Sequence, residues 1–354
     1  MLQRDPLPGM TATTITRSPR TFVGIDIGGT KVAAVLTDGH GTVLHQYWFT
    51  HSISGQDALL DEVERAYLEC VRAADQLSLA SPHSVGVGIA AWFAPGQSRI
   101  NYAAHFKIRD FELAAPLRER LGVPITIDND GNAQALGEFT FGSGRDAESL
   151  LLLSFGTGVG GGLIVNGAPL HGAHGYAGEL GHVTVDEDGP VCSCDAKGCL
   201  ESFAGGQALA RVGNRLSAPR ALAAAEARQV TAKDLVDAAR AGDVESTIAL
   251  DDAARAIAAA LRRLLPAFDP AVVTIGGSLG IHAAPWWMPV IERELAAMAP
   301  LQAVPQPRHI SVSSLGTLTT AIGAAALAIL RARVDDAKGA ATSTSTSEST
   351  SGAA

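Results

Sequence analysis

The sequence predicts an α/β protein made of two related halves with a cleft between them. Short apolar runs rich in Val, Ile and Leu alternate with helix-length amphipathic stretches. Residues 27–39 can also be laid without gaps on residues 155–167, each copy being strand, glycine turn, apolar strand, polar residue and glycine. The 354 residues, 47% of them hydrophobic, exceed what one core usually organises. We therefore expect two domains, with the site in the cleft.

The first half begins with three runs of β-branched and aromatic residues over 21–49, separated by glycine turns, which predict a strand meander. A helix is expected over 56–77, because apolar residues recur there every three or four positions. Cys70 lies on that apolar face and is expected to be buried packing. Residues 84–92 and 123–128 predict two more strands, buried on both faces.

The second half begins with a glycine-rich hairpin over 150–167. Thr231, with Asp234 three positions on, predicts a helix start, and residues 251–268 are a strong helix former. A last strand over 271–280 precedes more helix. We place a small domain at 21–131 and a large domain, which carries a cysteine-rich loop, at 132–316. A helix at about 317–333 is expected to pack back on the small domain.

Composition and the chain ends limit the function classes. Residues 1–20 and 335–354 are expected to be disordered tails, since the first segment has no signal-peptide core and the second is Ser/Thr-rich. The net charge of −9 argues against a nucleic-acid ligand. No segment runs ~20 apolar residues without interruption, so no membrane insertion is expected. Three clustered cysteines do not form a secreted disulfide framework, which favours the cytoplasm.

The stretch "DIGGTK" at 26–31 is a glycine turn between two predicted strands. It lacks P-loop spacing, so Lys31 is not assigned the Walker lysine role. Taken alone, the turn is either an ordinary hairpin or an anion site, since its N–H groups and the Thr30 hydroxyl can face a phosphate. Its repetition at 155–161, and a third glycine turn at 275–278, favour a nucleoside triphosphate bound across the cleft.

Asp128 and Asp130 flank Asn129 at the end of a predicted strand, where open α/β sheets present ligand groups. Either carboxylate could take a proton from an acceptor hydroxyl during phosphoryl transfer. Alternatively, both could cap the next helix or turn. Because adjacent acids raise each other's pKa, we expect one of the two to be salt-bridged or hydrogen-bonded.

His182, Cys192, Cys194 and Cys199 have the spacing H-x9-C-x-C-x4-C. One imidazole and three thiolates suit tetrahedral Zn²⁺ and leave no open position, so we predict a structural metal and not a zinc hydrolase. Unligated cysteines are the alternative, and a redox role is disfavoured because the C-x-x-C spacing is absent.

Six pieces, "DIGGTK", "DNDGNAQALGE", "FGTGVGGG", "HGYAGELGH", "CSCDAKGCLE" and "IGGS", occur in this order between residues 22 and 330. Their order resembles a sugar kinase of the ROK family, on the actin-like, hexokinase-like ATPase fold. The resemblance implies a homodimeric enzyme that uses ATP with Mg²⁺ to phosphorylate a hexose at its 6-hydroxyl, with glucose expected first. N-acetylmannosamine or another hexose or N-acetylhexosamine is the alternative acceptor, and polyphosphate the alternative donor.

The resemblance also implies roles for individual residues. Asp130 is the general base and Asp26 orients Mg²⁺ through water. The implied sugar ligands are Asn129, Glu179, His182, Glu201 and His105. The implied nucleotide and phosphate ligands are Asp26, Gly28, Gly29, Thr30, Lys31, Gly156, Thr157, Gly158, Gly276 and Gly277. The implied zinc ligands are His182, Cys192, Cys194 and Cys199.

The chain departs from the family pattern at three places. Ala104 and His105 stand where Pro-Asn is usual, which leaves the preference among epimers and N-acetyl sugars open. Trp92 lies in a stretch that lacks the usual Gly-Pro-Val-Asp; it could narrow the pocket or pack, and we favour packing. Asp195 replaces a glycine in the cysteine loop, where Asp tolerates a left-handed backbone.

Two other functions are weighed against the kinase. The family includes sugar-responsive repressors, but only ~20 residues precede the first glycine loop, too few for a three-helix DNA reader, and Asp130 favours catalysis. A non-sugar ATPase of the actin or chaperone type does not need the block from "GELGH" to "GCLE".

Overall fold

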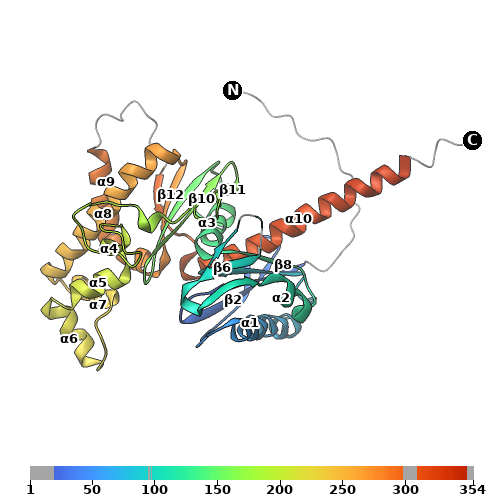
Figure 1. Ribbon diagram of the computed structural model, residues 1–354, viewed down its shortest axis with the longest axis horizontal. Helices are drawn as coiled ribbons and strands as arrows, with labels where there is room; N and C mark the ends of the chain where they lie inside the picture. The colour runs from blue at the N-terminus through green and yellow to red at the C-terminus, as the bar shows by residue number, and fades with distance from the viewer. Residues whose placement is uncertain (1–19, 95, 97, 298–308, 349–354) are drawn as a thin grey trace, which may run out of the picture.

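The computed structural model describes residues 20–94, 96, 98–297 and 309–348 and contains two five-stranded sheets of matching topology (Figure 1). The strand orders are β3-β2-β1-β4-β8 and β11-β10-β9-β12-β13. In each sheet a central strand pairs antiparallel with the strand that follows it and parallel with its other neighbour. The α/β fold with two related halves is confirmed.

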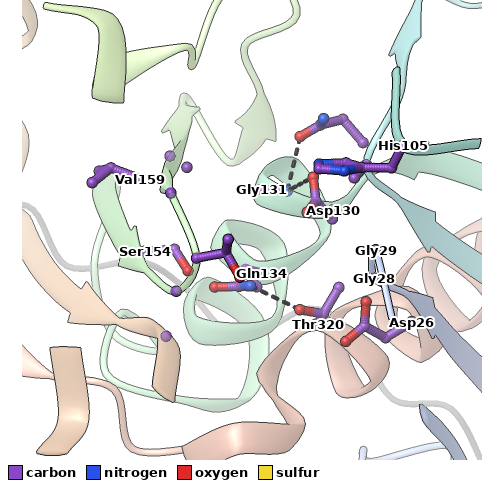
Figure 2. Close-up of a pocket in the computed structure, with 18 of the residues that line it drawn as sticks. Asp26, Gly28, Gly29, His105, Asp130, Gly131, Gln134, Ser154, Val159 and Thr320 are labelled. Atoms are coloured by element: carbon purple, nitrogen blue, oxygen red, sulfur yellow. Dashed lines mark hydrogen bonds between the residues drawn. The ribbon is translucent and has the colours of Figure 1, made fainter. Parts of the chain in front are cut away.

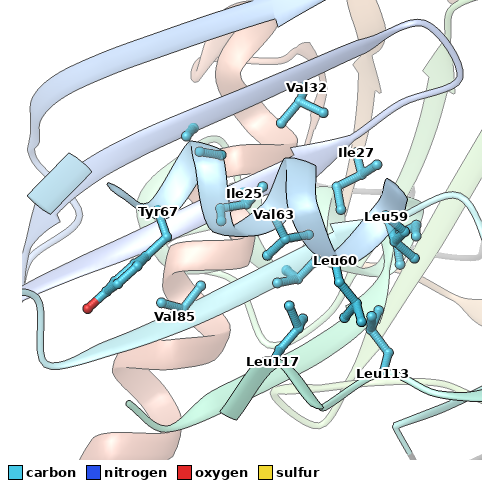
Figure 3. Packing of buried hydrophobic residues seen from close by; sticks show 14 of the residues in the cluster. Ile25, Ile27, Val32, Leu59, Leu60, Val63, Tyr67, Val85, Leu113 and Leu117 are labelled. Atoms are coloured by element: carbon cyan, nitrogen blue, oxygen red, sulfur yellow. The ribbon is translucent and has the colours of Figure 1, made fainter. Parts of the chain in front are cut away.

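The first sheet contains the predicted meander. Its strands are β1 (Thr21–Ile27), β2 (Lys31–Asp38), β3 (Val43–Thr50), β4 (Ser84–Ile89) and β8 (Ile125–Asn129). Helices α1 (Gln56–Gln76) and α2 (Ala114–Leu121) share one apolar core with these strands. Figure 3 shows Val63 of α1 beside Ile25 of the sheet, and Leu59 of the same helix beside Ile27. Cys70 is fully buried in this core, as predicted.

Two details of this half differ from the sequence predictions. Strand β8 was expected to be buried on both faces, but it is the edge of its sheet and only two of its five residues are fully buried. Leu77, assigned to the apolar face of the first helix, is its C-cap and is 50% exposed. Solvent reaches part of β8 because it is an edge strand, and it reaches Leu77 because α1 ends just before it.

Helix α10 (Thr319–Glu348) packs on the first sheet from the other end of the chain. At Gly24 and Gly86 an added Cβ would lie 1.9 Å and 1.7 Å from α10 carbonyl oxygens, so only glycine permits this contact. The stretch Gly316–Gly339 is long and apolar enough to cross a membrane, but 61% of its most apolar window is buried within the protein, as in a core helix.

The C-terminal tail expected from residue 335 is corrected over residues 335–348, which continue α10. Extending an existing helix adds one hydrogen bond for each residue fixed, whereas starting one is costly, and this Ser/Thr-rich segment follows a helix that is already packed. Residues 349–354, and residues 1–19 of the expected N-terminal tail, lie outside the described part of the chain.

The second sheet is covered by helices of the C-terminal half. Its strands are β9 (Leu150–Phe155), β10 (Val159–Val165), β11 (Ala168–Pro169), β12 (Val272–Gly276) and β13 (His309–Val312). The helices of this half are α4 (Glu201–Ala204), α5 (Gly206–Gly213), α6 (Ser217–Ala225), α7 (Ala232–Arg240), α8 (Val244–Phe268) and α9 (Gly277–Ala296). The predicted capping box of Thr231 and Asp234 is present at the start of α7.

Helix α3 (Asp130–Phe141) lies between the halves, since it contacts α10 on one side and strands β9 and β10 on the other. A small sheet of β5 (Trp92–Phe93), β6 (Arg99–Ala103) and β7 (Ile108–Glu112) projects from the first half. In the described part of the chain, short 3₁₀ segments carry loop residues: η1 (Ala104–Phe106), η2 (Leu180–His182) and η4 (Gly316–Leu318). The domain limits inferred from the sequence stay a prediction.

Candidate active site

A cavity of about 700 Å³ lies between the two sheets and gathers residues from both halves. Its wall contains most of the residues singled out in the sequence. These are Asp26, Gly28, Gly29, Thr30, His105, Asn129, Asp130, Gly156, Thr157, Gly158, Glu179, His182, Glu201 and Gly277. Lys31 and Gly276 are not in this wall. The Lys31 ammonium lies 4.2 Å from the Trp48 ring centroid, and Gly276 is the last residue of β12, directly before the cavity.

The structure at the junction of β8 and α3 shows which of the two aspartates is bound to other side chains. Asn129, not an aspartate, caps α3, because its side chain accepts from Gly131 N and Asn132 N. Asp128 is the tied acid: its Oδ2 lies 2.8 Å from His171 Nε2, and its Oδ1 accepts from the Asn132 side chain at 3.0 Å. This leaves Asp130, the first residue of α3, facing the cavity (Figure 2).

The two acids of the cavity floor are both hard to ionise. Burial raises the pKa of Asp130, and the charge of Glu179, not of Asp128, raises it further. Burial, and then the charge of Asp130, raise the pKa of Asp26 to about 7, although Lys31 and a hydrogen bond from Thr320 lower it. A buried carboxylate that is hard to ionise by itself suits a hard divalent cation such as Mg²⁺, so Asp26 fits the cation that accompanies ATP.

Two glycine turns face each other across the cavity. In the turn between β1 and β2, Gly28 N donates to Lys31 O at 3.0 Å, and His51 Nε2 lies 2.8 Å from Gly28 O. In the turn between β9 and β10, Gly156 N donates to Gly158 O at 3.0 Å. These turns leave backbone groups exposed to the cavity, as a phosphate site requires.

Glu201 connects the cysteine-rich loop to the second turn. Its Oε2 accepts from Val159 N at 2.9 Å and its Oε1 accepts from Ser193 Oγ at 2.6 Å. The carboxylate lies so close to the turn that a Cβ on Gly158 would stand 2.2 Å from Oε2. One carboxylate therefore contacts both the loop and the turn while lining the cavity.

The four candidate zinc ligands converge, with their ligand atoms within 4.8 Å of one another. Cys194 Sγ lies 3.7 Å from Cys199 Sγ, and Cys192 Sγ lies 3.5 Å from His182 Nδ1. A tetrahedral Zn²⁺ with ordinary bond lengths sets these separations at roughly 3.8 Å and 3.6 Å. Burial and the neighbouring thiols raise the pKa of Cys199 to about 12, so a cation is needed for all three sulfurs to be thiolates. The residues fit Zn²⁺.

The backbone of this loop is also suited to its turn. Asp195 has a φ of 67°, which matches the left-handed conformation expected where Asp replaces glycine. Gly198 has a φ of 69°, and a Cβ there would stand 1.5 Å from Asp186 O. The loop thus folds back on itself and brings Cys199 to the other two cysteines.

Comparison with known protein families gives a match to the ROK family over residues 22–331, most of the chain. The chain belongs to the ROK family. The glucokinase of Halalkalibacterium halodurans is 31% identical over 312 residues, which cover 86% of this chain and 94% of that protein. The xylose repressor of Bacillus subtilis is 29% identical over 316 residues, which cover 87% of this chain and 76% of the repressor. The relatives of this chain therefore include both kinases and regulators.

Solved ROK structures give the same result. The ROK hexokinase of Thermus thermophilus superposes with a TM-score of 0.70 at 30% identity, covering 88% of this chain and 99% of that one. A ROK family glucokinase of Streptomyces griseus, solved in complex with glucose and AMPPNP, superposes with a TM-score of 0.74 at 27% identity, covering 87% and 98%. The chain has the actin-like, hexokinase-like fold of these ROK enzymes.

Three cavity residues of this ROK protein were missed or only partly predicted from the sequence. Trp92 packs as expected, with its ring against Tyr102 and Tyr176, but it also lines the cavity, where its Nε1 donates to Glu179 Oε1 at 2.7 Å. Gln134 and Thr320 were not singled out, yet both line the cavity and are hydrogen-bonded to each other at 2.8 Å. Gln134 lies one helical turn after Asp130, so helical spacing alone points to it. Nothing local to Thr320 does.

Proposed function

We propose that this ROK protein transfers the γ-phosphoryl group of ATP to the 6-hydroxyl of a hexose, with glucose as the expected substrate. The observation that carries the proposal is the position of Asp130 at the N-terminus of α3 in the wall of the cavity between the two sheets, where its Oδ1 accepts from the backbone Gly131 N at 3.0 Å and no side-chain partner is found among the described residues. Similarity to glucokinases over most of the chain supports glucose and ATP as the substrates.

In the proposed reaction Asp130 takes the proton of the 6-hydroxyl, and the sugar oxygen forms a bond to the γ-phosphorus. The bond from that phosphorus to the bridging oxygen breaks, and ADP leaves with the electron pair. The N–H groups and hydroxyls of residues 28–30 and 156–158 would hold the phosphates. When bound, Mg²⁺ neutralises charge on the phosphates, and Asp26 would orient its water ligands.

The sugar would bind between Asn129, His105 and the residues that follow β11. Trp92 holds Glu179 from one side, and His182 Nε2 lies 4.0 Å from Glu179 Oε2 on the other. His182 turns its Nδ1 to the cysteines and its Nε2 to Glu179, so the predicted zinc would fix the ring that borders the sugar. In this proposal the zinc is structural and does not contact the phosphate.

Several finer points belong to the same proposal. We infer a cytoplasmic homodimer: the clustered cysteines, which do not form a secreted disulfide framework, favour the cytoplasm, and the family resemblance favours the dimer. An N-acetylmannosamine or other hexose kinase is the alternative, because His105 offers one donor and one acceptor where an amide is usual. A regulatory function is supported by the repressors among the relatives and opposed by the position of Asp130 in the cavity wall.

A coupled ADP-release assay over a panel of hexoses and N-acetylhexosamines, with ATP and with polyphosphate as donors, tests the proposal. We expect turnover to be highest with glucose and ATP. Asp130→Asn should lose at least ~100-fold in kcat, because the base is removed with little change of shape. No turnover on any sugar, or an Asp130→Asn variant as active as the parent, would overturn the assignment.

A further inference from the structure

Within its described part the chain passes between the two halves twice, and one buried carboxylate is bound to both passages. The first passage is α3 with the residues up to β9, and the second is residues 313–318, between β13 and α10. Glu138 lies on α3, the helix between the two sheets (Figure 1), and is fully buried. It has no part in the proposed reaction, although it lies about two helical turns after Asp130.

The Glu138 carboxylate accepts hydrogen bonds from both passages. From the first passage, Oε2 accepts from Ser143 N and Ser143 Oγ, both at 2.9 Å. From the second passage, Oε1 accepts from Ser313 Oγ at 2.5 Å and from Leu315 N at 3.2 Å. Ser314 N and Oγ add longer contacts to Oε2, at 3.4 Å and 3.3 Å. Each oxygen thus accepts from a backbone N–H, which can only donate, and these donors make the burial of a carboxylate tolerable.

Each passage is bound in turn to one half of the molecule. Ser143 Oγ lies 2.7 Å from Thr274 Oγ1 of β12, in the second sheet. Ser313 Oγ lies 3.0 Å from Oγ1 of Thr319, the first residue of α10, which packs on the first sheet. Both threonines are buried. The carboxylate therefore joins the two passages, and the hydroxyls beside it join them to both halves.

The second passage also forms part of the cavity wall. Gly316 and Thr317, which follow the residues bound to Glu138, line the cavity within η4, and η4 lies against α9. The first residue of α9, Gly277, adjoins the second glycine turn, since a Cβ there would stand 2.2 Å from Phe155 O. The proposed sugar ligands come from β8, η1, the η2 region and α4. In a row of sugar, phosphates and nucleoside, the wall at Gly277 and η4 is therefore left for the nucleoside.

We propose that Glu138 is a positioning residue for the nucleotide. Its carboxylate holds residues 313–315, and through them the wall at Gly316 and Thr317, at a fixed distance from α3, the helix that carries Asp130. This inference rests on the proposed function, since it takes a nucleotide as the ligand at this end of the cavity. Glu138 acts through the chain it holds and contacts neither substrate.

Glu138→Gln, a variant of matched size, tests the role of the carboxylate. Ser143 N and Leu315 N donate to different oxygens, so whichever position the amide nitrogen takes, one backbone N–H faces a second donor. With calorimetry in the presence of Mg²⁺, we expect the Kd of AMPPNP, a non-hydrolysable ATP analogue, to rise by about tenfold, the usual effect of losing a hydrogen bond to a charged group. The Kd of glucose, measured without nucleotide, should change by less than about twofold.

Ser313→Ala and Ser143→Ala are a matched pair that separates positioning from stability. Each removes one hydroxyl that donates to Glu138 and contacts a threonine hydroxyl, but only Ser313 lies on the passage that reaches η4. We expect both variants to lower the melting temperature by similar amounts. Only Ser313→Ala should weaken AMPPNP binding, by about threefold.

Three results would overturn the inference: an unchanged AMPPNP affinity in Glu138→Gln, equal losses of glucose and AMPPNP affinity in that variant, or equal losses of AMPPNP affinity in the two serine variants. The last two would show that the fold has only been loosened. If Glu138→Gln does not fold, the serine pair still decides. Binding is measured without turnover, so a protein that binds AMPPNP as expected and phosphorylates no hexose would defeat the proposed function alone.

Discussion

The two glycine turns are the same structural element supported in two different ways. Asp26 and Ser154 occupy matching positions, each one residue before the end of its strand. The first turn thus has a carboxylate on its own strand. The second has a neutral hydroxyl there and receives its carboxylate from Glu201, 47 positions after Ser154, through the bond to Val159 N.

The second turn is also held by its neighbours in the fold. Gly206 N donates to Gly156 O at 2.9 Å and Gln207 N donates to Thr157 O at 3.0 Å, both from the start of α5. The first turn is held mainly by His51, which contacts Gly28 O and Thr30 O. The difference indicates that the first turn has its own carboxylate, whereas the second depends on the cysteine-rich loop and the metal predicted there.

Removing the predicted zinc should have the largest effect, and it should affect the second turn much more than the first. Without zinc, the loop that ends at Cys199 loses its cross-links, and Glu201 is no longer held against the second turn. We expect Cys199→Ser, or chelation, to raise the KM for glucose by about 10–100-fold, as is typical when groups that orient a site are lost. The KM for ATP should rise less, because the first turn is untouched.

Equimolar zinc in the purified protein, and recovery of the KM on adding zinc back, are the controls for this experiment. A metal-free protein that is folded and has the parent KM for glucose would show that the loop does not need a metal. A larger loss of ATP affinity than of glucose affinity would show that Glu201 serves mainly the nucleotide.

Asp26→Asn tests whether the first turn carries an unfavourable charge. The pKa of Asp26 is about 7 in the folded protein and 3.8 in the absence of its surroundings, so the folded state binds the proton more tightly. That contribution to stability is fully present below about pH 4 and is lost as the pH rises through about 7. Without Mg²⁺, Asp26→Asn should therefore be more stable than the parent at pH 8, by roughly 2 kcal/mol, and not at pH 4.

Thermal unfolding between pH 4 and 8, with Ser154→Ala as the matched variant of the second half, measures this effect. Ser154→Ala should show the parent's dependence on pH, because it removes no charge. An Asp26→Asn protein that loses stability toward pH 8 as steeply as the parent would refute the assignment of that loss to Asp26.

The sequence alone was informative about the first turn and much less about the second. "DIGGTK" presents its carboxylate, glycines and hydroxyl in one continuous stretch, and the cysteine spacing predicts a zinc site whose ligand atoms do converge. The contact of Glu201 with Val159 N joins two separate motifs, and only the fold brings them together. Local patterns report local structure, so the support of the second turn could not be read from them.

The same reason explains what else the sequence did not show. The packing of Trp92 was expected, but its bond to Glu179 spans 87 positions. Thr320 reaches Asp26 only because α10 returns to the first sheet at Gly24 and Gly86. Lys31 was carried over from the family motif, but it lies at the exposed start of β2, beside Trp48.

Gly158→Ala tests the contact between Glu201 and the second turn by adding a single methyl group. The added Cβ would meet Glu201 Oε2 at 2.2 Å, so the carboxylate must swing away and leave Val159 N unpaired. Because the end of a Glu side chain moves easily, we expect little change in melting temperature but about a tenfold loss of glucose affinity, measured without nucleotide. Gly29→Ala is the matched change in the first turn, where the Cβ would lie 3.4 Å from His105.

Gly156→Ala is a second control, since no atom lies within 4 Å of its added Cβ. Both control variants should bind glucose within about twofold of the parent, because neither displaces Glu201. If all three variants lose glucose affinity equally, the turn itself and not the contact with Glu201 determines sugar binding.

The smallest expected effect concerns the contact between His171 and Asp128, which joins the two halves close to Asp130, the proposed base. His171 follows β11 in the second half, and its Nε2 lies 2.8 Å from Asp128 of β8 in the first. The hydrogen bond to Asp128 raises the pKa of His171. This stabilisation is complete below the ordinary His pKa near ~6.5 and is lost as the pH rises through the raised value.

With 36% of the His171 side chain exposed, solvent screens the pair, and we expect His171→Gln to lose less than about 1 kcal/mol of stability at pH 6 and less at pH 9. Glutamine can still donate to Asp128, so Asp130 should keep its place and kcat should stay within about twofold of the parent. Denaturant unfolding at both pH values measures the difference. A loss that is larger at pH 9 than at pH 6 would mean that the neutral imidazole, and not the charged one, holds the halves together at this point.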